Sequence, residues 1–167
     1  MAARPEHQSG VTTRNRFEVL AVEAQPNAKT RMSAIEFNVA EVRKPLASAV
    51  KMVKANNRVV LDEEQSYIEN KATGEKMMVK IQDETFVFDV EYDNGEKGTI
   101  TLDSGAGVNV WPRGARQDVP VMAKKPGLRM CAANGTEIKN YGRKVIQFKG
   151  LAVKENDVEE SGFRRLA

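Results

Sequence analysis

The stretch of the chain best suited to chemistry places one acidic residue between an apolar run and two small residues. It reads Ile100-Thr101-Leu102-Asp103-Ser104-Gly105-Ala106-Gly107-Val108-Asn109-Val110. The apolar residues before Asp103 predict a buried strand that ends in a tight turn. Gly105 and Gly107 let the backbone bend there and let a second chain approach closely. The stretch therefore predicts a carboxylate held at the end of a strand, and the alternative is an ordinary turn without function.

The composition is typical of one soluble domain with a tail. The chain has 167 residues, 41% of them hydrophobic, with 26 Lys and Arg against 23 Asp and Glu. Both signs of charge are interleaved, whereas a dedicated nucleic-acid binder usually gathers positive charge on one face. No apolar run approaches the ~20 residues that cross a membrane, and the beginning of the chain lacks the apolar core of a secretory signal.

Cysteine and histidine usage limits the chemistry further. Cys131 is the only cysteine, so it cannot form an intramolecular disulfide, and the sequence predicts an intracellular, cytoplasmic or nuclear protein. One cysteine and one histidine also argue against a structural zinc site. We expect neither a metal nor a cofactor.

Alternating apolar and polar residues predict a mainly β domain over about residues 34–152. The predicted strands are 34–42, 58–61, 66–70, 76–81, 85–92, 98–102, 128–133, 136–142 and 144–149. Pro45 is expected to open one short helix over residues 46–54, with Leu46, Val50 and Val53 on its apolar face. Many short strands with one helix predict a small closed β-barrel or a folded sheet.

Two Asn-Gly pairs predict hairpins. Asn94-Gly95 separates strands 85–92 and 98–102, and we expect a type I′ turn because both residue types tolerate positive φ. Asn134-Gly135 separates two further short strands in the same way. Trp111 is expected to be an anchor of the core or of an interface.

Both ends of the chain are predicted to be tails. Residues 1–30 are polar and charged apart from the apolar island Phe17–Val22, which predicts disorder, and 153–167 is charged. Deleting the first tail should leave the melting temperature unchanged.

Leu102-Asp103-Ser104-Gly105-Ala106 resembles the active-site signature of retropepsin-like aspartic peptidases, in which Asp-Thr/Ser-Gly-Ala follows apolar residues. Residues 128–136 with Tyr141-Gly142 resemble the segment after the catalytic turn in copia-type retrotransposon peptidases, and residues 42–50, 59–61 and 67–69 resemble that family's downstream half. The resemblance implies a retropepsin-type barrel and an endopeptidase derived from a retroelement polyprotein.

The order of the two halves departs from the family. The helix-bearing half comes first here, which implies either a circular permutation or the junction of two tandem copies. In retropepsins the first and last strands lie side by side, so Asp93-Asn94-Gly95 could join them, and the new ends would lie between Phe148 and Ile35. There is a second departure. Retropepsins usually carry an apolar-apolar-Gly segment that packs on the catalytic turn, whereas Val42–Pro45, which stands near that place here, contains no glycine.

The resemblance also implies a mechanism. Two closely spaced carboxylates share one water and cannot both ionise, so one acts as acid while the other activates the water. The chain contains a single Asp-Ser-Gly, so activity requires a homodimer in which each subunit gives one Asp103. The substrate would be a polypeptide, and the subunits' own polyprotein is a candidate.

The neighbours of Asp103 receive roles by the same resemblance. Ser104 would form a hydrogen bond across the two-fold axis, and Gly105 would allow the two turns to approach. Ala106 and Gly107 would contact the substrate, and Asn134-Gly135 is the candidate tip of a flap that closes over it. The alternative for Asn134-Gly135 is an ordinary surface hairpin.

Two other functions remain open. The domain could be a retropepsin-like fold without catalysis, serving as a binding or dimerisation module. It could instead be a fragment associated with nucleic acid, suggested by six basic residues: Arg113, Arg116, Lys124, Lys125, Arg164 and Arg165. Binding of that last kind would weaken with salt.

Overall fold

The computed structural model describes residues 32–151. Both predicted tails, the island Phe17–Val22 and Arg164-Arg165 lie outside these residues, so the expectation about deleting the first tail stays a prediction. The elements are β1 Ser33–Ala40, β2 Leu46–Ser48, α1 Ala49–Lys54, β3 Asn57–Val60, β4 Ser66–Asn70, β5 Lys76–Gln82, β6 Thr85–Tyr92, β7 Lys97–Asp103, β8 Val110–Pro112, β9 Met130–Cys131, β10 Glu137–Ile138 and β11 Gly142–Gly150.

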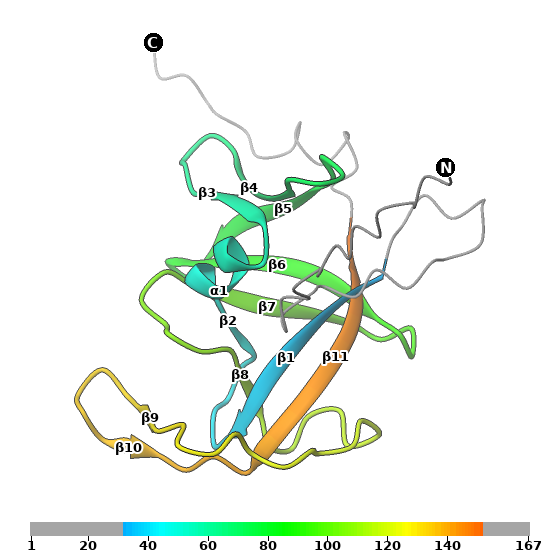
Figure 1. The fold of residues 1–167 in the computed structure, drawn as a ribbon. Helices are drawn as coiled ribbons and strands as arrows, with labels where there is room; N and C mark the ends of the chain where they lie inside the picture. The colour runs from blue at the N-terminus through cyan, green and yellow to red at the C-terminus, as the bar shows by residue number, and fades with distance from the viewer. Residues whose placement is uncertain (1–31, 152–167) are drawn as a thin grey trace, which may run out of the picture.

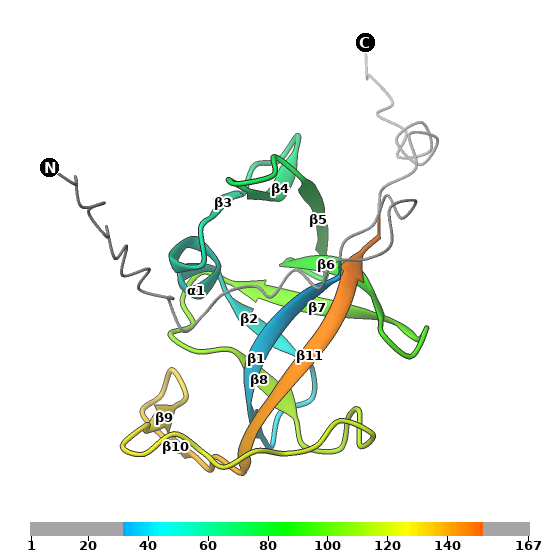
Figure 2. The same ribbon diagram turned by 45° about the vertical axis from the view of Figure 1, so that its right-hand side comes forward.

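Six strands form a closed barrel. The order is β11-β1-β8-β2-β7-β6, and a pairing between β11 and β6 closes the ring. Strands β5, β4 and β3 extend the sheet outward from β6, and Figures 1 and 2 show them as a separate lobe beside α1, above the barrel. The prediction of a mainly β barrel with one short helix is confirmed.

The hairpin predicted at Asn94-Gly95 is confirmed, although its turn type is different. β6 and β7 are antiparallel neighbours, with Phe86 opposite Leu102. In this turn only Gly95 has positive φ, at 85°, so the predicted type I′ turn is wrong. Gly95 N–H donates to the Tyr92 carbonyl at 2.9 Å, as expected for a three-residue loop whose last residue is left-handed.

The predicted helix begins three residues later than expected. Residues 46–48 form β2, because they pair in parallel with β7, Leu46 opposite Thr101. α1 then begins after Ser48, whose hydroxyl accepts a hydrogen bond from the Lys51 N–H at 3.3 Å, the usual role of a serine N-cap.

The predicted apolar face of the helix is also wrong. Ala49 and Met52 are the buried residues of α1, whereas Val50 and Val53 are 45% and 49% exposed. The later start explains the difference, since Leu46 belongs to a strand and no longer fixes which side of the helix meets the core.

Trp111 lies in the hydrophobic core, which is one of the two places predicted for it. The indole is 1% exposed, and it makes edge-on contacts with Phe37 at 5.1 Å and Tyr92 at 5.9 Å between ring centroids. Its Nε1–H donates to the Ala115 carbonyl at 3.0 Å. Trp111 lies in β8, a strand that is absent from those predicted and that pairs in parallel with β1.

The two ends of the described chain lie side by side. β1 and β11 are antiparallel, with Ser33 opposite Phe148 and Ile35 opposite Ile146. The chain therefore enters and leaves the barrel at one edge, the region in which the sequence placed the new ends.

Candidate active site

Asp103 is the last residue of β7 and lies between two neighbouring strands. Its partner on one side is Ser48 of β2, and β6 lies on the other side. The side chain is half-buried, and Oδ1 accepts a hydrogen bond from the Gly105 N–H at 2.7 Å. The predicted strand followed by a tight turn is confirmed, and this hydrogen bond orients the carboxylate within the turn.

Two polar residues, the buried Ser48 and the half-buried Asn109, brace the turn between β7 and β8. Ser48, which is fully buried, donates its hydroxyl proton to the Ala106 carbonyl, and its N–H donates to Asn109 Oδ1 at 2.7 Å. Asn109 in turn donates through Nδ2 to the Glu36 carbonyl at 3.0 Å and accepts from the Asn38 N–H at 2.9 Å. The middle of the turn is therefore fixed to β2, and its end at Asn109 is fixed to β1 and β2.

Sequence reasoning missed Ser48 and Asn109. It assigned the segment packed on the turn to Val42–Pro45, but Leu46–Ser48 takes that place and directly precedes α1. Serine is a common N-cap residue, so its position at the start of a short helical pattern was a signal that could have identified Ser48. Nothing in the sequence pattern indicated that its hydroxyl would also contact the turn.

The structure places the other predicted site residues in the same turn. Ser104, Gly105 and Gly107 are exposed, and Ala106 is half-buried. A side chain at Gly105 would put its Cβ 3.3 Å from Asp103 Oδ1, which is tight, while a Cβ at Gly107 would meet nothing within 4 Å. Within one chain, therefore, only Gly105 is restricted by its surroundings.

The hairpin at Asn134-Gly135 is confirmed, with shorter strands than predicted. β9 and β10 have two residues each and form a separate sheet. Gly135 has φ 82°, and both tip residues are exposed. Figures 1 and 2 show this hairpin on the same side of the barrel as the β7–β8 turn.

A small apolar cluster links the base of this hairpin to the turn. Its buried members are Ala40, Val110 and Met130, and the half-buried residues packed against them include Val108, Leu46 and Ile138. Val108 belongs to the turn, and Met130 and Ile138 belong to β9 and β10. The tip of the hairpin is therefore exposed, while its base is packed beside the turn that follows Asp103.

The predicted basic residues do not form one free face. Arg116 is buried and pairs with Asp93 and Asp118, each at 2.7 Å. Its hydrogen bonds hold the pKa of the Asp118 carboxyl below the usual value, and Asp118 raises the pKa of Arg116. Arg113 pairs with Glu41 at 2.9 Å and Lys125 with Glu36 at 2.7 Å.

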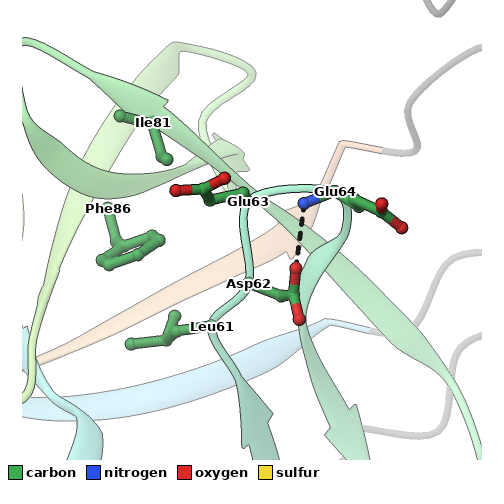
Figure 3. Close-up of a pocket in the computed structure, with 6 residues that line it drawn as sticks. All are labelled: Leu61, Asp62, Glu63, Glu64, Ile81 and Phe86. Carbon is green, nitrogen blue, oxygen red and sulfur yellow. Dashed lines mark hydrogen bonds between the residues drawn. The ribbon is translucent and has the colours of Figure 1, made fainter.

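A pocket of about 600 Å³ lies elsewhere, between the β3–β4 connection and the β5–β6 hairpin. It is lined by Leu61, Asp62, Glu63, Glu64, Ile81 and Phe86, as Figure 3 shows. None of the predicted site residues lines it. It adjoins the same sheet, because Phe86 is the partner of Leu102, the residue before Asp103.

Within residues 32–151, no group of three His, Cys, Asp or Glu side chains could hold a metal ion, and no helix is long and apolar enough to span a membrane. Cys131 is an exposed free thiol. Comparisons with protein-family models, with curated proteins and with solved structures found no match.

Proposed function

We propose that this protein is a retropepsin-like aspartic endopeptidase that works as a homodimer, with one Asp103 from each subunit. The observation that carries the proposal is the braced turn. Asp103 ends a barrel strand, accepts the Gly105 N–H at 2.7 Å, and is followed by a turn that Ser48 and Asn109 fix to two neighbouring strands. A carboxylate that activates water must be held in place in this way.

The proposed chemistry is peptide-bond hydrolysis by a shared water. Two Asp103 carboxylates that meet across a two-fold axis cannot both be ionised, so they hold one proton between them. The ionised carboxylate takes a proton from the water, which attacks the scissile carbonyl carbon. The protonated carboxyl donates its proton to the carbonyl oxygen, which gives a tetrahedral diol. The carboxyl that took the water's proton then gives it to the amide nitrogen while the other carboxylate takes back a hydroxyl proton, so the C–N bond breaks and the pair again holds one proton.

Exposure of the turn supports the dimer. Ser104, Gly105 and Gly107 face solvent in one chain, so they are accessible to a second copy of the turn. A Cβ at residue 107 would meet nothing within 4 Å among the described residues, so the close approach of a second subunit would explain why this residue is a glycine. Ser104 would then bond across the axis, and the Asn134-Gly135 tip would close over the peptide, beside Ala106 and Gly107.

The connectivity supports a rearranged retropepsin-like order of segments. β6 and β7 are joined by a tight turn at 93–95, and β1 and β11 are antiparallel neighbours at the ends of the described chain. A circular permutation needs both features. A junction between tandem copies whose halves dock as one domain accounts for them equally well, and in either case we infer a retroelement polyprotein as the source.

The test is cleavage of unstructured polypeptide substrates by the purified full chain. We expect pepstatin-sensitive cleavage that Asp103→Asn abolishes while the fold is kept, because asparagine is nearly isosteric and cannot act as acid or base. Asp83→Asn is the matched control, since Asp83 lies in the β5–β6 turn, and it should cleave normally. Activity retained by Asp103→Asn would refute the mechanism. A folded dimer with no cleavage under any condition would favour the non-catalytic dimerisation module instead.

A further inference from the structure

The pocket between the β3–β4 connection and the β5–β6 hairpin has an apolar floor that the described residues leave uncovered. Ile81 and Phe86 are opposite each other in the β5–β6 ladder, and Leu61 completes the floor. Ile81 is 56% exposed, the largest value among the exposed large hydrophobic residues of the described chain. Removing such a side chain from water favours binding, so this floor favours an apolar occupant.

The rim of the pocket is acidic, and no residue within 32–151 gives its carboxylates a cationic partner. Asp62, Glu63 and Glu64 follow one another in the loop and are all exposed. Among the described residues no lysine or arginine forms an ion pair with any of the three. Figure 3 shows the Glu63 side chain reaching toward Ile81 and Phe86, while Asp62 and Glu64 point away from them.

The loop that carries this rim is held in a defined shape. Ser66 Oγ donates to the Asp62 carbonyl and accepts from the Asp62 N–H, both at 2.8 Å. Asp62 Oδ1 accepts from the Glu64 N–H at 3.0 Å, the bond drawn in Figure 3. The three carboxylates are therefore presented on a preformed loop, so binding does not have to order the rim of the pocket.

We propose that this pocket binds a segment of the same chain, Phe163-Arg164-Arg165-Leu166. The segment combines two large apolar side chains with two adjacent arginines, which complements an apolar floor beneath three carboxylates. In an extended segment Phe163 and Arg165 share one side, so Phe163 can cover Ile81 while Arg165 meets Glu63. Arg164 adds attraction to the remaining negative charge of the loop. The inference is independent of the proposed peptidase activity.

The described chain ends close enough for this contact. The Leu151 N–H donates to the Asp89 carbonyl at 3.1 Å, and Asp89 is on β6, the strand that carries Phe86. The distance from Asp89 to Phe86 along the strand is about 10 Å at ~3.3 Å per residue. The connection from Leu151 to Phe163 can span roughly 40 Å when extended, so the segment reaches the pocket without moving the barrel.

The test uses the full chain with one spin label and NMR. In a Cys131→Ser background, Ala167→Cys carries the label next to the proposed segment. We expect selective broadening of the amide signals of residues 62–64 and 81. Glu63→Lys with Glu64→Lys should abolish the broadening, and adding Arg164→Glu with Arg165→Glu should restore it. The matched control is Glu75→Lys with Glu137→Lys, which makes the same charge change at two exposed sites away from the pocket and should leave the broadening intact.

Three outcomes would overturn the proposal. The first is an absence of broadening at the pocket in the labelled chain. The second is broadening there by a label at Ala2→Cys and none from Ala167→Cys, which would identify the N-terminal segment as the occupant. The third is broadening that appears only between chains, in a mixture of spin-labelled and isotope-labelled protein. Because the readout is a contact and not cleavage, an inactive protein would leave the result interpretable.

Discussion

The position of the Asp103 side chain depends on Ser48, which is distant in sequence. The Ser48 hydroxyl donates to the Ala106 carbonyl inside the turn and accepts from the Lys51 N–H at the start of α1. One side chain therefore fixes the turn and caps the helix. Whatever reaction Asp103 supports, the position of its carboxylate is coupled to the start of that helix.

Ser48→Ala should weaken both functions of this residue. Loss of the cap is expected to reduce the free energy of unfolding by about 0.5–2 kcal/mol, and the freed turn should lower kcat more than it raises KM. Denaturant unfolding and steady-state kinetics measure the two effects. Ser66→Ala is the control, because Ser66 is also buried and bonded to its own loop, yet it is remote from Asp103. If both variants lose stability alike and keep equal kcat, the proposed bracing by Ser48 is wrong.

At the scale of the elements, β11 makes a close contact with the loop of residues 113–129 that follows β8. Met122 and Arg143 form an isolated antiparallel bridge, and next to it Gly142 has φ 136°. A Cβ at residue 142 would collide with the Met122 carbonyl oxygen and come within 2.5 Å of Val121 Cγ1. This contact fixes the start of β11, the strand that closes the barrel.

Gly142→Ala should therefore destabilise the barrel. Backbone strain at this φ and the forced displacement of a backbone oxygen together should cost about 1–3 kcal/mol, measured as a lower midpoint of thermal or urea unfolding. Gly114→Ala is the comparison, since a Cβ there meets nothing within 4 Å and its φ is not positive. Equal midpoints for the two variants would contradict the close approach.

For the whole molecule, an ion cluster ties the β6–β7 turn to the chain after β8. Arg116 bonds Asp93 on one side and Asp118 on the other, and its hydrogen bonds hold the pKa of Asp118 below the usual value. The folded state therefore favours the ionised carboxylate. The stabilisation is complete above about pH 4 and is lost as the pH falls through the lowered value in the folded protein.

Acid titration of stability tests this cluster. We expect the urea concentration at half-unfolding to decrease as the pH is lowered below about 4. Asp118→Asn should make this decrease smaller, because it removes one of the carboxylates responsible. Asp83→Asn changes a turn carboxylate that forms no ion pair within the described chain. This variant should show the same decrease of the urea midpoint at low pH as the unchanged protein. An Asp118→Asn protein with the full acid dependence would show that the ion pair contributes nothing.

The proposed dimer predicts a concentration dependence. Since each chain has one Asp-Ser-Gly, the cleavage rate per chain should fall on dilution below the dimer dissociation constant, and activity should be highest on the acid side of neutrality, where two carboxylates share one proton. Activity at several chain concentrations, compared with sedimentation of the same samples, measures this. A monomer that cleaves at an undiminished rate per chain would rule out a dyad between subunits.

Local patterns in the sequence predicted several strands and turns, inside and outside the barrel. Alternation of apolar and polar residues located β4 and β6, and Asn-Gly pairs located both hairpins, because strand period and turn chemistry act between residues close in the chain. The strand and turn around Asp103 followed from the same local reasoning. Trp111 was expected to be an anchor of the core or of an interface.

Tertiary structure decided what the local pattern could not. Residues 46–48 have a helical pattern but form β2, because β7 offers a parallel partner 55 residues away and pairing with it outweighs a weak local preference. The groups that fix the Asp103 turn are similarly remote, since Ser48 and Asn109 lie 61 residues apart. The periodicity of apolar residues carries no information about such remote pairs. The contacts of Ser48 and Asn109 with the turn, and the buried face of α1, are therefore determined by the tertiary structure.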